Sequence, residues 1–72
     1  MEKSIMTHAL NYCKKTGDRS LIFTANGFQI HGCVKKYDED SVVVINDKGE
    51  TQIVQRNNIS TVVPPKGYRY DS

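Results

Sequence analysis

Long hydrophobic runs are missing from these 72 residues, and cysteine and histidine each occur only twice. No stretch approaches the ~18 consecutive apolar residues of a membrane-spanning helix, and the N-terminus has no apolar signal segment. The sequence therefore predicts a cytoplasmic location. The two cysteines, Cys13 and Cys33, have no ligand spacing to each other or to a histidine. This predicts reduced, partly buried thiols, and neither a metal site nor another cofactor.

A catalytic arrangement of residues is also lacking. Neither His8 nor His31 has a carboxylate or a serine at a spacing typical of acid–base or nucleophilic catalysis. The adjacent acids at positions 38–40 diverge in a turn, which predicts a solvated loop. We therefore expect no catalytic residues and no enzymatic activity.

An excess of charge of one sign is missing as well. Ten Lys and Arg residues face eight Asp and Glu residues, and the net charge of +2 does not establish a polyanionic partner. The distribution says more, because residues 1–20 carry four basic and two acidic side chains, whereas residues 21–58 carry four and five. A symmetric oligomer would repeat the basic N-terminal patch around a rim.

The most informative stretch runs from residue 21 to residue 38. Its centre, Asn26-Gly27, predicts a two-residue hairpin turn with positive φ at both positions. Residues 21–23 are apolar and β-prone, and residues 28–35 alternate between apolar and polar side chains, as in a half-buried strand. Gly32 lies within that strand, where it permits a sharp bend or a close backbone approach.

The remaining elements follow from periodicity and turn residues. Helical spacing predicts a helix over residues 4–16, capped by Ser4 and ended by Gly17. Strands are predicted at about 20–25, 28–36, 41–46, 51–56 and 59–63, with a bulge near Lys35 and a left-handed corner at Asn57-Asn58. Residues 4–64 thus form one domain and residues 65–72 a flexible tail. The fold class is mostly β with one N-terminal helix, a small, strongly bent, five-stranded antiparallel SH3-type barrel.

The last strand, residues 59–63, is apolar on both faces and lacks the lysines or prolines that usually protect an edge. A domain of this size buries only ~60% of its unfolded surface and is marginal alone. Pairing between the edges of successive copies is therefore expected, and such pairing closes into a ring where the rotation allows.

Three runs carry a resemblance to a known family: residues 26–32 (NGFQIHG), 37–38 (YD) and 59–64 (ISTVVP). In this order, after a helix, they resemble the Hfq family, the bacterial branch of the Sm-like proteins, over about residues 5–64. The amino-acid sequence of the first run is most similar to that of Gram-positive members. The resemblance implies a ring of six subunits, joined through the fourth and fifth strands, that binds RNA and promotes pairing between small regulatory RNAs and messages.

The resemblance implies an adenine-binding site on the distal face, the side of the ring away from the helices. Phe23 would stack on the base, Phe28 would form a second apolar wall, and Gln52 and Thr61 would make polar contacts. The path would be lined by Asn26, Gly27, Gln29, Ile30 and His31. Aromatic faces stack on any base and an amide pairs with an adenine edge. The residues alone favour plain core packing of Phe23 and Phe28, and the resemblance favours a role in stacking on bases instead.

The opposite, proximal face departs from the family pattern. Family members carry Tyr-Lys-His before the last strand, where this chain has Gln55, Arg56 and Asn57. Met6 replaces a glutamine, and the loop with Glu39 and Ser41 lacks the usual aromatic residue. The proximal pocket is therefore expected at Met6, Glu39, Ser41, Arg56 and Asn57, with weak binding of U-rich RNA.

Basic residues of the family's rim correspond to Lys14 and Lys15. Their place in the last helical turn fits a role in complementing the helix dipole equally well. Two other functions stay open: an SH3-like or Sm-like module that binds a peptide or subunit without RNA, and a divergent Hfq copy that forms mixed rings.

Overall fold

The structure is a computed structural model that describes residues 4–69 of the chain. The one α-helix of these residues, α1, spans Ile5–Thr16. The helix begins where the Ser4 hydroxyl accepts a hydrogen bond from the Thr7 amide at 3.0 Å. It ends at Gly17, whose positive φ of 70° lets its amide reach the Cys13 carbonyl. The expected capping residues therefore act at both ends.

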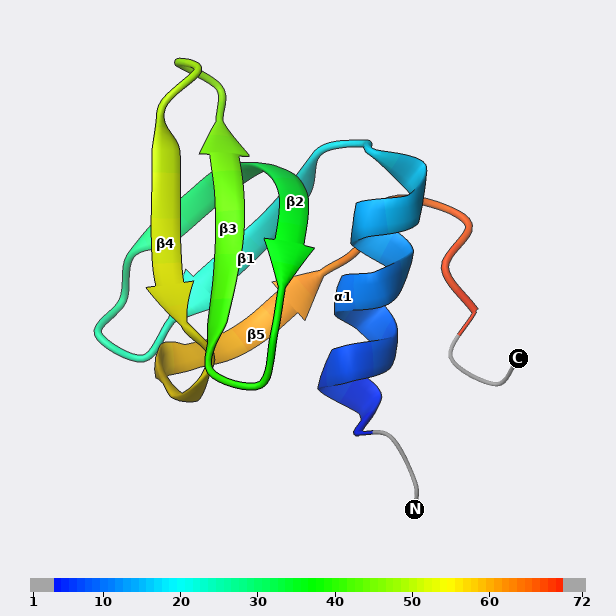
Figure 1. The fold of residues 1–72 in the computed structure, drawn as a ribbon, viewed down its shortest axis with the longest axis horizontal. Coiled ribbons are helices and arrows are strands. Elements are labelled where there is room, and N and C mark those ends of the chain that lie inside the picture. The colour runs from blue at the N-terminus through cyan, green and yellow to red at the C-terminus, as the bar shows by residue number, and fades with distance from the viewer. Residues whose placement is uncertain (1–3, 70–72) are drawn as a thin grey trace.

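Five strands follow the helix: β1 (Ser20–Thr24), β2 (Gln29–Tyr37), β3 (Ser41–Asn46), β4 (Thr51–Gln55) and β5 (Ile59–Val63). They form one antiparallel sheet in the order β4-β3-β2-β1-β5. The sheet curls so that β5 crosses below β3 and β4, and α1 lies along the open side (Figure 1). The predicted fold class is confirmed, and β4 and β5 form the two free edges of the sheet.

The core lies between the concave side of the sheet and α1. On β1, alternate residues are buried, as a strand with one face against a core requires. The same alternation places Val42 and Val44 of β3 inside, where they are fully buried. The buried cluster comprises Leu10, Cys13, Ile22, Val34, Val42, Val44, Val54 and Ile59. Cys13 is therefore a buried free thiol, and Cys33 is a half-buried free thiol, as predicted.

Gly32 produces the close backbone approach that the sequence predicts. It pairs with Ser20 of β1 on one side and with Asn46 of β3 on the other. A Cβ atom at this position would lie 2.3 Å from the Ile45 carbonyl oxygen. Two residues further along, the register between β2 and β3 shifts between Val34 and Lys36. The predicted bulge is thus confirmed, and it lets β2 serve both halves of the curled sheet.

Two turn predictions are wrong. Among residues 4–69 no residue other than glycine has positive φ, so neither Asn26 nor the Asn57-Asn58 corner is left-handed. The Gly27 amide donates to the Thr24 carbonyl at 3.0 Å, and Gly27 alone has positive φ, 93°. This is a three-residue loop that ends on a left-handed glycine. At the other corner the chain turns through a short 3₁₀ helix, η1 (Arg56–Asn58).

Beyond β5, the segment through Lys66 to Arg69 runs along the side of α1 that faces away from β3 and β4 (Figure 1). The Tyr12 hydroxyl donates to the Lys66 carbonyl at 3.0 Å. The flexibility predicted for residues 65–72 stays a prediction, and residues 70–72 lie outside the described part. Within residues 4–69, α1 is too short and too polar to cross a membrane.

Candidate nucleic-acid interface

An open groove of about 760 Å³ lies between the β1–β2 loop and β4. Six of the nine residues predicted for the distal face line it: Asn26, Phe28, Gln29, Ile30, His31 and Gln52. These residues come from the β1–β2 loop, β2 and β4, and the curl of the sheet brings them together. The structure thus collects most of the predicted site in one depression.

Hydrogen bonds of Thr24 fix the loop that presents Phe28. The Thr24 hydroxyl donates to Asn26 Oδ1 at 2.6 Å and accepts from the Phe28 amide at 3.0 Å. The Thr24 amide donates to the Phe28 carbonyl at 2.9 Å. These hydrogen bonds hold the backbone of Phe28 in place, yet Phe28 is 66% exposed. An aromatic ring held in the open by its backbone is available to stack on a ligand.

Gln52 lies on the groove side of β4. It pairs with Val44, which points into the core, so its side chain shares the concave face. The Gln52 Oε1 atom is buried and has no hydrogen-bond partner within residues 4–69. An unpaired buried acceptor costs ~1–3 kcal/mol. This amide is therefore ready to accept a hydrogen bond from a donor that enters the groove.

Phe23 and Thr61 lie on the other face of the sheet. Phe23 pairs with Thr61 of β5 and with Gln29 of β2, and cross-strand partners share a face. The three side chains form one row on the convex side, and Phe23 is half-buried there. Neither Phe23 nor Thr61 lines the groove within this chain. The predicted distal-face residues thus form two neighbouring groups, which Gln29 joins.

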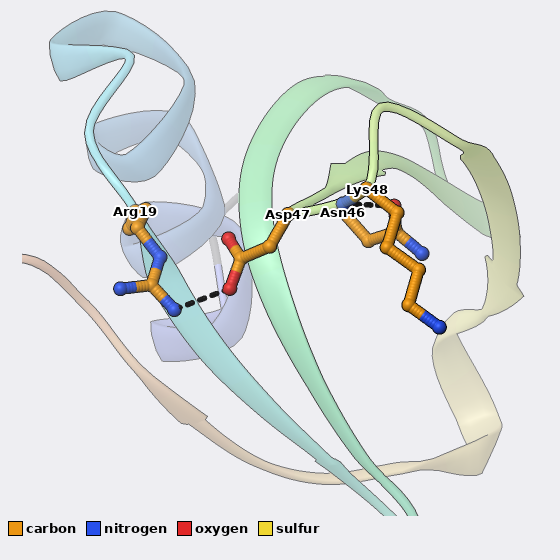
Figure 2. A network of polar contacts seen from close by, with 4 residues as sticks. All are labelled: Arg19, Asn46, Asp47 and Lys48. Carbon is orange, nitrogen blue, oxygen red and sulfur yellow. Dashed lines mark hydrogen bonds and ion pairs between the residues drawn. The ribbon is translucent and has the colours of Figure 1, made fainter.

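The β3–β4 turn forms the polar mouth of the groove. Asn46 Oδ1 accepts hydrogen bonds from the amides of Lys48 at 3.0 Å and Glu50 at 2.9 Å. Figure 2 shows Arg19, directly before β1, next to Asp47, with which it forms an ion pair of 2.6 Å. Both partners are more than half exposed, so the pair adds at most ~1 kcal/mol of stability. The ion pair nevertheless neutralises Asp47, one of the two acids at the mouth. The other acid, Glu50, shares the mouth with the cation Lys48.

Arg56, one of the predicted proximal residues, makes two side-chain hydrogen bonds. Its Nη2 atom donates to the Thr7 hydroxyl of α1 at 2.7 Å, and its Nη1 atom donates to the Asp38 carbonyl at 2.8 Å. Met6 packs against the core. The Ser41 amide donates a hydrogen bond to the Asp38 carboxylate at 2.7 Å. Two of the five Arg56 donors therefore connect the helix with the β2–β3 turn.

The remaining predicted proximal residues add no ring for stacking. Glu39 and Asn57 are exposed, and neither is aromatic. Lys14 and Lys15, predicted for the rim, are both exposed in the last turn of α1. No group of three or more His, Cys, Asp or Glu side chains in residues 4–69 is arranged to hold a metal ion.

The β2–β3 turn depends on the charge of Asp38. Hydrogen bonds from the backbone amides of Asp40 and Ser41, followed by the positive charges of Arg56 and Lys36, lower the pKa of the Asp38 carboxyl. A carboxyl with a lowered folded-state pKa stabilises the fold fully above its unfolded value, and loses that contribution as pH falls through the folded-state pKa.

We therefore expect Asp38→Asn to flatten the acid limb of the stability curve. Denaturant unfolding at pH values from 2 to 6 measures this. The wild-type protein should lose stability as pH falls below 3.8, the ordinary pKa of an Asp carboxyl, and Asp38→Asn should lose less. Glu39→Gln is the matched control, because the exposed Glu39 side chain makes no hydrogen bond or ion pair with residues 4–69. Identical acid limbs for Asp38→Asn and the wild type would contradict the assignment.

Comparison with known proteins assigns this chain to a family. A family model described as Hfq protein matches residues 5–69. The chain belongs to the Hfq family. The RNA-binding protein Hfq of Halalkalibacterium halodurans is 35% identical to this Hfq-family chain over 63 residues, which cover 88% of the chain and 80% of that relative. The RNA-binding protein Hfq of a Geobacillus species is 30% identical over 69 residues, which cover 96% of the chain and 92% of the relative.

A solved structure agrees with the family assignment. It is the crystal structure of the pleiotropic translational regulator Hfq, which superimposes with a TM-score of 0.76 at 28% sequence identity. The match covers 83% of this chain and 98% of that one. The resemblance inferred from the three sequence runs is confirmed, and so is the Sm-like fold.

Sequence reasoning missed several groups that surround these sites. Asn46 and Lys48 at the groove mouth carry no binding signal in the sequence, because the residues around Gly49 indicate only a turn. The contact between Arg56 and Thr7 joins residues 49 positions apart, so no local pattern could reveal it. One signal was available. Four polar residues of α1 recur at helical spacing away from the core: His8, Asn11, Tyr12 and Lys15.

Proposed function

We propose that this Hfq-family chain forms a hexameric ring in the cytoplasm and binds A-rich single-stranded RNA on its distal face. The ring would promote pairing between small regulatory RNAs and messages, and it performs no catalysis. One observation carries the proposal: the exposed Phe28 ring and the unpaired Gln52 acceptor lie in the same groove.

The chemistry of the groove suits adenine. A base stacked on an aromatic side chain gains ~1–3 kcal/mol, whatever its sequence. Adenine also offers an exocyclic N6 amino group, which donates a hydrogen bond, next to an acceptor. The Gln52 Oε1 atom lacks a donor in the free chain, so adenine would supply what the fold leaves unsatisfied. Binding would then remove a cost that the free protein carries.

The free edges of the sheet support the ring. β5 lies at one edge, next to the β1 strand that carries Phe23, and β4 with Gln52 lies at the other. If β5 of one copy pairs with β4 of the next, the convex row of Thr61 and Phe23 comes beside the neighbour's β4. The two groups of predicted distal residues, which lie apart in one chain, would then complete one site between copies.

The proximal face supports a preference against uridine. Arg56 preserves a positive charge there, but two of its donors are held by Thr7 and by the Asp38 carbonyl. The turn at residues 38–40 adds three acidic side chains per copy, which a ring would repeat. Because none of the five residues predicted for the proximal pocket is aromatic, this face should bind U-rich RNA weakly.

We expect Gln52→Met to stabilise the free protein and to weaken its preference for adenine. Methionine has a similar size, fills the same space and removes the unpaired acceptor, whose presence costs ~1–3 kcal/mol. The ratio of dissociation constants for C18 and A18 RNA should fall about tenfold, within the ~1–3 kcal/mol that one good amide–base pair supplies. Fluorescence anisotropy at fixed salt measures the ratio, and calorimetry measures the melting temperature.

Thr51→Val is the matched control, because Thr51 precedes Gln52 on β4 but does not line the groove. It should leave the C18/A18 ratio unchanged. A Gln52→Met protein that melts at a lower temperature and keeps the wild-type ratio would show that Gln52 serves the fold and not the recognition of adenine. Failure of A18 to bind the wild-type ring at all would favour the peptide-binding alternative.

A further inference from the structure

Thr24, the last residue of β1, places a hydroxyl group where the strand turns its side chains toward the core. Alternate residues of β1 are buried, and Thr24 is only 7% exposed. Valine has nearly the same shape as threonine and would fill this position without a polar group. A buried hydroxyl costs free energy unless it is hydrogen-bonded, so its partners indicate what it does for the protein.

Both partners of this hydroxyl lie in the β1–β2 loop. Thr24 Oγ1 donates to Asn26 Oδ1 at 2.6 Å. The same oxygen accepts a hydrogen bond from the Phe28 amide at 3.0 Å. One side chain thus joins the middle of the loop to the residue that carries the exposed ring.

Backbone hydrogen bonds hold the same loop independently of the hydroxyl. The Ala25 amide donates to the Asn58 carbonyl at 2.7 Å, at the end of the η1 corner. The Thr24 amide donates to the Phe28 carbonyl at 2.9 Å. A Thr24→Val substitution leaves these backbone groups in place. Loss of the hydroxyl therefore frees the Phe28 amide and the Asn26 side chain without detaching the loop from the sheet.

We propose that Thr24 is a positioning residue of the RNA site, because its hydroxyl holds Phe28 in the conformation that stacks on a base. The inference rests on the proposed function, which gives Phe28 the stacking role. Thr24 and Phe28 both line the groove, but the Thr24 hydroxyl already has two partners in the loop. Thr24 therefore acts on RNA through Phe28. Affinity falls in proportion to the fraction of time that the binding conformation is populated.

The first measurement is amide hydrogen exchange at Phe28, followed by NMR of the full-length protein without RNA. Thr24→Val removes the acceptor of this amide and should accelerate its exchange about fivefold. The Ala25 amide, bonded to the Asn58 carbonyl, should stay protected. Thr24→Ser keeps the hydroxyl and should exchange like the wild type. Equal Phe28 rates in Thr24→Val and the wild type would overturn the proposal, as would a wild-type rate equal to that of an unfolded chain.

The second measurement is the affinity for labelled A18 RNA by fluorescence anisotropy. Thr24→Val should weaken binding about three- to tenfold, which is less than the effect of Phe28→Ala because the ring is still present. Thr24→Ser should restore most of the affinity. Serine lacks the methyl group of threonine, so this rescue would assign the effect to the hydroxyl and not to packing. The slope of log K against log salt should stay at the wild-type value, because no charge changes.

Ser20→Ala is the matched control for loss of a buried hydroxyl. Ser20 lies at the other end of β1, is 5% exposed and does not line the groove. Its removal should change the A18 affinity less than about twofold, because the two sites are independent. Gel filtration and calorimetry establish that each variant is assembled and folded at the temperature of the titration. Equal losses of affinity in Ser20→Ala and Thr24→Val would overturn the proposal in favour of a general effect on the fold.

The double variant Thr24→Val with Phe28→Ala shows whether Thr24 acts through the ring. Once the ring is gone, loss of the hydroxyl should change the A18 affinity less than about twofold, because the two substitutions remove one shared effect. The same loss in both backgrounds would overturn positioning in favour of direct contact between Thr24 and RNA. A wild-type protein that bound no A18 would overturn the proposed function together with the RNA role of Thr24. Equal A18 affinities of Thr24→Val and a wild-type protein that binds would overturn this inference alone.

Discussion

Gly32→Ala should leave the protein largely unfolded at 25 °C. The added Cβ atom would lie 2.3 Å from the Ile45 carbonyl oxygen and 2.8 Å from the Asn46 Cα atom, both in the backbone of β3. Backbone atoms cannot rotate away as a side chain can, so β2 and β3 would have to separate where the sheet bends. Large costs of this kind exceed ~4 kcal/mol, which is comparable to the whole stability of a small domain.

Gly49→Ala is the matched control for this prediction. Gly49 has a φ of 82°, but a Cβ atom there would meet no atom within 4 Å. The substitution should therefore cost only the ~1–2 kcal/mol of a left-handed conformation in a residue other than glycine. Circular dichroism during thermal and denaturant unfolding measures both variants. A cooperative Gly32→Ala transition within a few degrees of the wild type would show that the approach of β2 and β3 is not tight.

Phe28→Ala should cause the largest loss of RNA affinity without loss of the fold. The ring is 66% exposed, so its removal leaves no cavity in the core. Loss of one stacked base costs ~1–3 kcal/mol, a factor of about five to 150 in the dissociation constant for each site. Because one A-rich strand would occupy several sites around a ring, the losses accumulate. Phe23→Ala should act in the same direction, with a further loss of stability because Phe23 is half-buried.

Ile5→Ala provides a control for general loss of exposed apolar surface. Ile5 is 78% exposed at the start of α1 and does not line the groove. Anisotropy titrations with labelled A18 should show wild-type affinity for Ile5→Ala and a strong loss for Phe28→Ala, while gel filtration confirms that both assemble alike. Unchanged A18 affinity in an intact Phe28→Ala ring would rule out the groove as the site of stacking.

The backbone of this fold follows closely from local sequence patterns. Ser4 and Gly17 set the ends of α1, Gly32 marks the close approach, and Lys35 marks the bulge, because each acts through contacts that its own residue type dictates. The Asn26-Gly27 pair by itself does not predict the loop that the structure shows. The Thr24 hydroxyl bonds to both Asn26 and the Phe28 amide, and this favours a longer loop.

The site was predictable only in part. Six of the nine residues that the resemblance implies for the distal face line the groove, but the resemblance did not tell which face each side chain takes. Alternation along β4 gives this information, since Gln52 lies two residues before the buried Val54. The contacts of Arg56 with Thr7 and of Tyr68 with His8 depend on how α1 lies against the sheet and the final segment. Such contacts between distant residues leave no periodic signal in the sequence.

The central claim, a ring that takes A-rich RNA, is tested most directly by sedimentation velocity with fluorescent RNA. Labelled A18 and U18 are sedimented separately with the protein at equal, moderate salt. The account predicts that A18 sediments with a particle of six copies of the 8.2 kDa chain, about 49 kDa, plus the RNA. U18 should require about tenfold more protein to do so, in line with the ~1–3 kcal/mol by which one good amide–base contact discriminates against the wrong base. A18 that stays free, or that sediments with a single chain, would contradict the account, as would equal binding of A18 and U18.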